Sequence, residues 1–211
     1  MNDGVLHVPH IQFLMQWEPN PVGNCLVIDC TSRSDTAHSQ LSPFKLGPVK
    51  LWGGHVAKNV ENAWQFSKVY PIHMDWNAPH LMDLEKWMAW ASSGWSDHRA
   101  HRYPMGRCAQ PIFSYWDGER LSYVEARKKI YVPLYATAVQ KTALYHSLYE
   151  TLRHNPHRTV VIKDFDVYPM DTTQYDWFDT VLDNPHRKCG HGFVLGAMLQ
   201  GRPLPNLQRR T

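Results

Sequence analysis

The chain has 211 residues, and its 22 Lys and Arg against 19 Asp and Glu give a formal net charge of +3. A charge so close to neutral excludes a histone-like protein or one that binds nucleic acid through a basic tail. No apolar run is long enough to span a bilayer and residues 1–10 lack the order of a secretory signal, so we expect a cytoplasmic protein without a membrane segment.

The first quarter of the chain predicts little regular structure. Residues 1–24 mix Pro, Asn, Gly and apolar residues without a sustained period, which predicts an irregular N-terminal segment. The apolar run CLVID at 25–29 predicts a short buried strand, and the polar stretch 31–40 predicts a loop. A turn at Gly47-Pro48 then leads to a second predicted strand that ends at Gly53-Gly54.

Three helical segments follow. The first runs from Lys58 or Asn59, with Asn59 as N-cap, to about Tyr70 before Pro71. The second runs from Leu81 to Trp90 and ends at the Ser-Ser-Gly of 92–94, and residues 95–116 are predicted to be largely loop. The longest, 123–153, contains Pro133 as a kink or a break.

The C-terminal part predicts a strand over Val160–Ile162 that leads to Asp164 and Asp166, then a glycine-rich turn and helix over 190–200. Together these elements predict an α-rich α+β fold with short strands, as a single domain over residues 25–202 followed by a flexible tail over 203–211. The four cysteines are predicted to be free thiols, because a chain of this length buries a core without cross-links.

The first helix carries one narrow polar line, formed by Glu61, Gln65 and Lys68. A solvated face with ordinary i,i+3 and i,i+4 pairs is one interpretation. However, apolar residues cover most of the remaining circumference, so the helix is predicted to be buried. Because buried charges are paired or take part in chemistry, we favour a functional line of residues.

This line, written E-x3-Q-x2-K and preceded by LSPF at 41–44, resembles the signature of the NADAR (YbiA-like) N-glycosidase family. Further matches follow in the family's order and extend the resemblance over residues 41–202. They are Gly106-Arg107, Pro111, Trp116, Gln140-Lys141-Thr142, Asp166, Gly192 and Leu195-Gly196. Pro43 and Phe193 stand where the family has Asn, and the Trp-Gly that normally follows the Asp is missing after Asp166, so we expect a divergent member.

The resemblance implies an N-glycosidase that acts on a nucleotide-derived substrate without metal or organic cofactor. Cleavage of an N-glycosidic bond builds positive charge at the anomeric carbon and negative charge on the departing base. In the implied roles Glu61 stabilises the sugar cation, Lys68 attacks the anomeric carbon to form an imine, and Asp166 protonates the base or positions the ribose. In the alternative route Glu61 directs a water at the anomeric carbon and no imine forms. The implied substrate-binding residues are Gln65, Trp116, Trp64, Arg107, Ser42 and Phe44.

The substrate stays open between ADP-ribosylated guanine, free or in DNA, and a riboflavin-pathway intermediate. We expect Arg99, Arg102 and Arg107 to face a phosphate of that substrate, although a solvated basic loop has the same composition. The competing hypothesis is a non-catalytic module that binds a nucleotide or ADP-ribose on the same fold. The nine Trp and ten Tyr fit base stacking as well as ordinary packing.

Two rival sites are weaker. His186, Cys189 and His191, with Cys25 or Cys30, contain zinc-ligand types, but their spacing is irregular and no C-x-x-C pair exists. Cys108 or Cys189 would serve as a nucleophile only beside a histidine, and no local context singles out either.

Overall fold

Two compact units form along the chain, which the computed structural model describes from residue 8 to residue 206. Contacts group Met1–Ser42 with Val139–Thr211 as unit 1, and Pro43–Ala138 forms unit 2. Both boundaries fall inside the single domain predicted over 25–202. Most of the predicted flexible tail, residues 207–211, lies outside the described residues. Within residues 8–206, no helix combines the length and apolar character that a membrane crossing needs.

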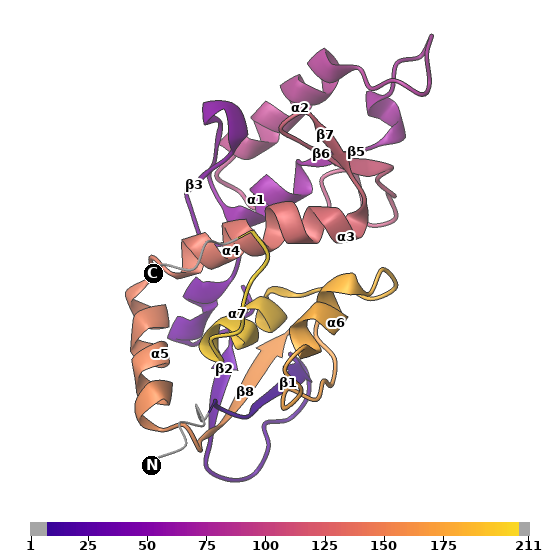
Figure 1. Ribbon diagram of the computed structural model, residues 1–211. Helices are drawn as coiled ribbons and strands as arrows, with labels where there is room; N and C mark the ends of the chain where they lie inside the picture. Colours follow the sequence, from indigo (N-terminus) through magenta and orange to yellow (C-terminus); the bar gives the residue numbers. More distant parts are fainter. Residues whose placement is uncertain (1–7, 207–211) are drawn as a thin grey trace. The chain divides into compact units, whose positions relative to one another are not determined.

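Unit 1 is built on the strand β8 (Thr159–Asp164), which lies between β1 (Ile11–Met15) and β2 (Cys25–Asp29) and pairs with both in parallel (Figure 1). Five of its six residues are buried, because the central strand of a parallel sheet is covered on both faces. The predicted strand over Val160–Ile162 is therefore confirmed and longer than expected, and the strand over 25–29 is confirmed as β2.

The prediction of an irregular segment over residues 1–24 is wrong for β1. Ile11 and Phe13 are buried while Gln12 between them is exposed, a period of two that is too short to stand out in the sequence. Ile11 also exchanges two hydrogen bonds with the hydroxyl of Thr172, at 2.8 and 3.3 Å. The strand is thus fixed by partners about 150 or more positions away in the chain.

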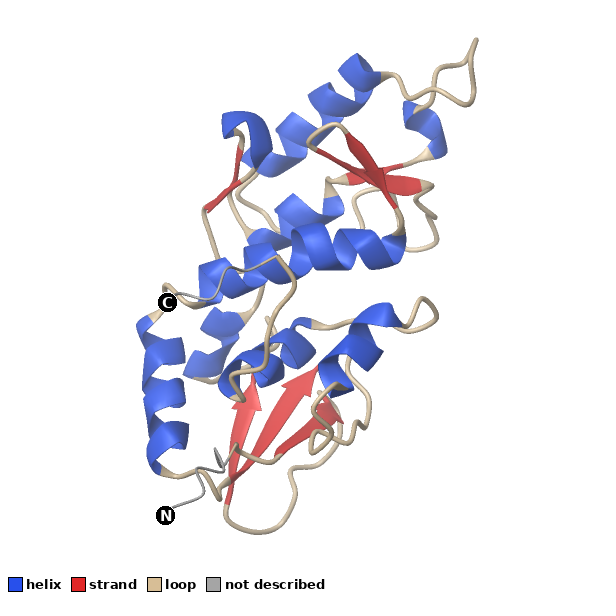
Figure 2. Ribbon diagram, viewed as in Figure 1, coloured by secondary structure: helices blue, strands red, loops and turns tan. Residues whose placement is uncertain are grey.

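Three helices complete unit 1: α5 (Ala143–His154), α6 (Trp177–Asp183) and α7 (His191–Leu199) (Figure 2). The predicted turn and helix over 190–200 are confirmed as α7, whose residues are all buried. Gly196 allows this helix to approach the sheet, because a Cβ there would lie 2.8 Å from the Phe13 ring. Helix α6 was not predicted. The predicted loop 31–40 contains a 3₁₀ turn, η1 (Ala37–Leu41), capped by Thr36.

Unit 2 combines short antiparallel strands with short helices. The strand predicted to end at Gly53-Gly54 is only β3 (Val49–Lys50), and the two glycines lie in the turn η2 (Trp52–Gly54) before β4 (Val56–Ala57). A second sheet has the order β5 (Lys68–Val69), β6 (Phe113–Trp116) and β7 (Glu119–Leu121) (Figure 2). The prediction that 95–116 is largely loop is confirmed over 97–112, and only the last four residues form a strand, β6. The β6–β7 hairpin turns at Asp117-Gly118, which takes the positive φ angles of a two-residue turn.

The predicted helix over 59–70 is wrong beyond Gln65. Asn59 caps α1 (Val60–Gln65) as expected, with its side chain accepting from the Asn62 N–H at 2.7 Å. The helix then ends because the Ser67 hydroxyl donates to the Trp64 carbonyl at 2.8 Å and the chain turns into β5. Lys68 therefore lies on a strand and not on the helix.

The second helix, α2 (Leu84–Ser96), runs through the Ser-Ser-Gly that was predicted to end it. Gly94 serves packing instead, because a Cβ there would lie 2.0 Å from the Phe66 ring. Asp83 caps the start of the helix, three residues later than predicted.

The long helical pattern over 123–153 breaks at residues 140–142 and not at Pro133. It forms α3 (Tyr123–Ala126), a π-helical turn η4 (Arg127–Tyr131), α4 (Val132–Val139) and α5. The Val132 N–H donates to the Arg127 carbonyl, five residues back. Pro133 has no N–H to donate to the preceding turn, which favours this wider helical register just before it.

We predict that Gly190→Ala destabilises the protein by about 1–3 kcal/mol, the usual cost of overpacking a core. The φ of Gly190 is ordinary, but an added Cβ would lie 2.4 Å from Asp164 Oδ2 and 2.8 Å from the Asp166 carbonyl. Urea denaturation measures the change. Ser147→Ala on the exposed side of α5 is the control, and an unchanged midpoint for Gly190→Ala would contradict this packing.

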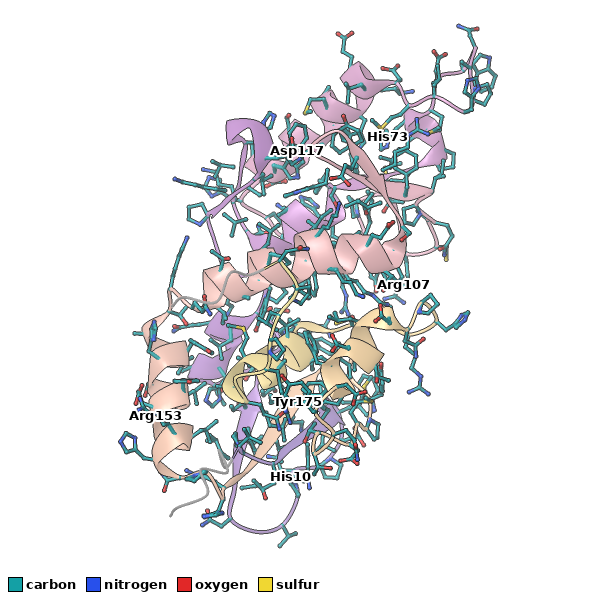
Figure 3. The ribbon with its side chains drawn as sticks, in the orientation of Figure 1. His10, His73, Arg107, Asp117, Arg153 and Tyr175 are labelled. Carbon is teal, nitrogen blue, oxygen red and sulfur yellow. The ribbon has the colours of Figure 1, made fainter. Side chains whose placement is uncertain are left out.

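A second prediction concerns His73, labelled in Figure 3, which is 2% exposed and accepts from the Tyr70 N–H at 3.2 Å. Burial, with a smaller contribution from Lys86, lowers the pKa of His73 to about 4. As pH falls, His73 takes up a proton near pH 6.5 in the unfolded chain but only near pH 4 in the folded chain. The folded state is therefore destabilised progressively between these two pH values, by about 3 kcal/mol in all.

The variant His73→Asn keeps an acceptor near the Tyr70 N–H and does not titrate. Its free energy of unfolding, measured by urea denaturation from pH 7 to pH 4, should depend less on pH than that of the unmodified protein. His98→Gln, at an exposed position, is the control. Equal slopes for His73→Asn and the unmodified protein would contradict the prediction.

Candidate functional site

The three predicted polar residues of unit 2 are joined by hydrogen bonds, although Lys68 is not on the helix. Gln65 Nε2 donates to Glu61 Oε1 at 2.9 Å, and Lys68 Nζ donates to Gln65 Oε1 at 2.6 Å. We call Glu61, Gln65 and Lys68 the polar relay. The two bonds fix the orientation of the Gln65 amide, because its donor end faces the carboxylate and its acceptor end faces the amine.

The polar relay is buried at one end and accessible at the other. Glu61 is 5% exposed and Gln65 is 8% exposed, whereas Lys68 is half-buried. The backbone of Lys68 is also fixed, since the Trp87 indole N–H donates to its carbonyl at 3.1 Å. The relay therefore has a half-buried amine at one end and a buried carboxylate at the other.

Aromatic rings surround the lysine end of the relay. Lys68 Nζ lies 4.9 Å from the ring centroid of Trp64, a cation–π distance. The Trp64 ring in turn lies 5.2 Å from Tyr131 and 6.4 Å from Tyr123, between centroids. Trp64 was predicted to bind substrate, and the structure places it beside the predicted nucleophile. Tyr123 and Tyr131 were not predicted.

Arg127 brings a second cation to these rings and was also missed by the sequence analysis. It is 1% exposed, and its guanidinium carbon lies 3.9 Å from the centroid of Tyr123. It belongs to the π-helical turn, a feature that is frequent at functional sites. The only sequence signal for this turn was Pro133, which we interpreted as a kink or a break. We did not connect Pro133 to Arg127, which lies about one and a half helical turns earlier.

Trp116 lies on the same sheet face as Lys68. In the β5–β6 register Lys68 pairs with Ser114, and Trp116 is two residues further along β6, so the three side chains share one face. Tyr115 faces the other way, with its ring 5.0 Å from that of Trp87 on α2. The structure thus places Trp116 on the same sheet face as Lys68, and its role in substrate binding stays a prediction.

The arginine-bearing loop 97–112 is tied to α1 through one buried side chain. Asn62 Nδ2 donates to the carbonyls of Asp97 and Arg99, both at 2.9 Å, and Asn62 Oδ1 accepts from the His101 N–H at 2.8 Å. Asn62 is fully buried, so these three bonds fix the start of the loop next to the helix that carries the relay.

Further along the loop the predicted arginines gather at one ring. The guanidinium carbons of Arg102 and Arg107 lie 5.7 and 5.9 Å from the centroid of Tyr103. Arg107, labelled in Figure 3, is exposed, and so is Arg99. The loop therefore presents cations at its surface, as expected from the sequence.

The remaining predicted site residues are distributed between the units. Phe44 belongs to unit 2 and is half-buried, whereas Ser42 is buried at the end of η1 in unit 1. Asp166 also belongs to unit 1, where it pairs with Lys188 at 3.0 Å. The part of the candidate site that lies in unit 2 therefore consists of the polar relay, its aromatic rings and the arginine loop.

Unit 1 contains a buried polar group that the sequence analysis did not single out. His191 Nδ1 lies 3.2 Å from Asp164 Oδ2, and His191 Nε2 lies 2.8 Å from the Cys30 carbonyl. Asp164 Oδ2 also accepts from the Gly192 N–H at 3.0 Å, so this carboxylate caps α7 and joins it to β8. These bonds hold α7 against β8 and the end of β2, so the pair has a structural role.

The rival sites gain no support from this arrangement. Among residues 8–206, no three side chains of His, Cys, Asp or Glu gather as metal ligands. All four cysteines are free thiols. Burial, then the charges of Asp164 and Asp29, raise the pKa of the Cys30 thiol, which opposes thiolate chemistry there.

Comparison with known proteins places the chain in a family. Residues 18–176 match a family of unknown function (DUF6939). The chain belongs to the DUF6939 family. The matched segment contains the polar relay, Trp116 and the arginine loop, whereas α7 lies beyond it. No curated protein and no solved structure matches the chain. The resemblance of this DUF6939 protein to NADAR enzymes therefore stays a prediction.

We predict that Asn62→Ala loosens the start of the arginine loop. The loss of three hydrogen bonds, with carbonyls and an N–H left unsatisfied, should lower stability by about 2 kcal/mol or more. Hydrogen exchange should accelerate at the His101 amide. Asn77→Ala, at an exposed position, is the control. Unchanged exchange at His101 would contradict the anchoring role of Asn62.

Proposed function

We propose that this protein is an N-glycosidase that acts on a nucleotide-derived substrate through Lys68. The observation that carries the proposal is the polar relay, in which a buried carboxylate, an amide and an amine are hydrogen-bonded in line beside an aromatic ring. The motif resemblance to the NADAR family gives the reaction class, and the geometry of unit 2 supplies groups suited to it.

In the proposed reaction the neutral amine of Lys68 attacks the anomeric carbon while the bond from that carbon to the base breaks. The proton released by the attacking amine balances the negative charge on the departing base. The sugar ring then opens to an imine on Lys68, and water releases the sugar and regenerates the amine. Glu61, held behind the amine by Gln65, stabilises positive charge that develops at the sugar.

Several neighbours fit the substrate class. Trp64 and Trp116 offer flat rings close to Lys68 or on its face of the sheet, which suits stacking on a base. The exposed Arg99 and Arg107 suit the phosphates of an ADP-ribose group. The proposal covers ADP-ribosylated guanine, free or in DNA, and riboflavin-pathway intermediates, in a cytoplasmic setting. It needs no metal or organic cofactor.

A second candidate is nucleotide or ADP-ribose binding without catalysis. The observation that favours it is the 5% exposure of Glu61, which leaves the carboxylate little access to a ligand. In that case the relay would orient the Lys68 ammonium toward a phosphate, and the tryptophans would hold the base.

We predict that the protein releases free base from one of three candidate substrates: ADP-ribosylated guanosine, ADP-ribosylated DNA and the riboflavin intermediates. Borohydride added during turnover should reduce the imine and leave a sugar adduct on Lys68, located by peptide mass spectrometry. Lys68→Ala and Lys68→Arg should both lose nearly all activity, because arginine stays protonated. Glu61→Gln should lower kcat by about 10²-fold.

Lys50→Ala, at an exposed position in β3, is the matched control and should keep full activity. Activity retained in Lys68→Arg would exclude the imine route. Tight binding of ADP-ribose that Lys68→Ala weakens, together with no turnover of any candidate, would favour the binding module over the enzyme.

A further inference from the structure

Unit 1 contains an open cavity of about 480 Å³ at the end of its sheet where β2 and β8 begin. Its wall comes from the C-terminal end of α5, the following loop and the residue before β2. The β2–β8 register pairs Cys25 with Thr159, which brings these two segments together. The lining residues are Asn24, His154, Asn155, Pro156, His157 and Arg158.

The chemistry of this wall favours an anion. Arg158 carries a permanent positive charge, and the two asparagine side-chain amides are hydrogen-bond donors. No Asp or Glu is part of the lining. A cavity with a cation and several donors but no carboxylate attracts oxyanions and repels metal ions.

Arg158 also contains a donor that the protein does not use. Its Nε is buried and makes no hydrogen bond among residues 8–206. Burying such a donor without an acceptor costs free energy, but this nitrogen is closed off from solvent and a ligand in the open cavity does not reach it. A bound phosphate would instead accept from the terminal nitrogens of the Arg158 guanidinium, a planar group that matches phosphate geometry.

Local hydrogen bonds hold the wall in place before any ligand binds. The His154 Nδ1 lies 2.8 Å from the Glu150 carbonyl, and Asn155 Nδ2 donates to the Thr151 carbonyl at 2.8 Å. The Arg158 N–H donates to the Asn155 carbonyl at 3.1 Å, which closes the loop. Because a carbonyl only accepts, His154 Nδ1 carries the proton in this bond, and the ring is held against the helix as part of the wall.

We propose that this cavity binds the phosphate group of a small phosphorylated molecule, with Arg158 as its principal contact. The volume lies within the range of small-molecule sites and accommodates a nucleoside monophosphate as well as a free phosphate ion. The site belongs to unit 1 and does not depend on the relay of unit 2, so it stands or falls separately from the N-glycosidase proposal.

The test is isothermal titration calorimetry of the full chain with inorganic phosphate, adenosine monophosphate and adenosine. We expect both phosphate-bearing probes to bind and adenosine not to bind. Tighter binding of the monophosphate than of inorganic phosphate would identify a phosphate ester as the ligand, and equal binding would identify free phosphate. Absence of binding by both phosphate probes at millimolar concentration would overturn the proposal.

Arg158→Gln should weaken binding at least about 10-fold, the scale of one lost charged hydrogen bond. Arg158→Lys keeps the charge but lacks the planar guanidinium, so it should bind with intermediate affinity. It also serves as the test if the glutamine variant fails to fold. Arg153→Gln, at the exposed α5 arginine labelled in Figure 3, is the matched control and should bind normally. Equal weakening by Arg153→Gln, or unchanged affinity in both Arg158 variants, would show that phosphate binds elsewhere.

Discussion

The amide of Gln65 connects a buried carboxylate to an amine, and the arrangement of the candidate site depends on this connection. A carboxylate as buried as Glu61 needs hydrogen-bond donors, and the Gln65 Nε2 supplies one. The same amide then accepts from Lys68, so the amine has a fixed place relative to Trp64. Gln65 therefore lies between the two charged groups and is hydrogen-bonded to both.

The backbone around the relay explains why the helix is so short. If α1 continued past Gln65, Lys68 would remain on the helix surface and could not pair with β6. The turn at Ser67 instead places Lys68 opposite Ser114, where the hairpin that carries Trp116 begins. The Trp87 indole fixes the Lys68 carbonyl from the other side of the sheet. The end of α1, the strand β5 and the β6–β7 hairpin together position the amine of Lys68.

The sequence predicted the composition of this site better than its geometry. Glu61, Gln65 and Lys68 were identified from a helical period, and they are indeed joined, but Lys68 reaches Gln65 from a strand. The period could not reveal the turn, because the extended backbone of residues 67–69 is paired with residues of β6 and its flank that lie more than 40 positions away in the chain. Arg127 was invisible for a related reason: its position follows from a π-helical turn, which has no strong residue signature.

In unit 1 the sequence predicted local elements and missed long-range ones. The runs that form β2, β8 and α7 are apolar enough to be recognised by themselves. In contrast, β1 and the Asp164–His191 pair depend on partners far along the chain, and the Arg158 cavity exists only because β2 lies beside β8. Such features follow from topology, which composition and periodicity do not encode.

The most direct test of the central claim is a crystal structure of the full chain in complex with ADP-ribose. The account predicts that the ribose anomeric carbon lies within reach of Lys68 Nζ, at about 3–3.5 Å, and that the Gln65 amide still bridges Glu61 and Lys68. A ligand bound away from Lys68, with the polar relay unchanged and Lys68 not in contact with it, would contradict the claim.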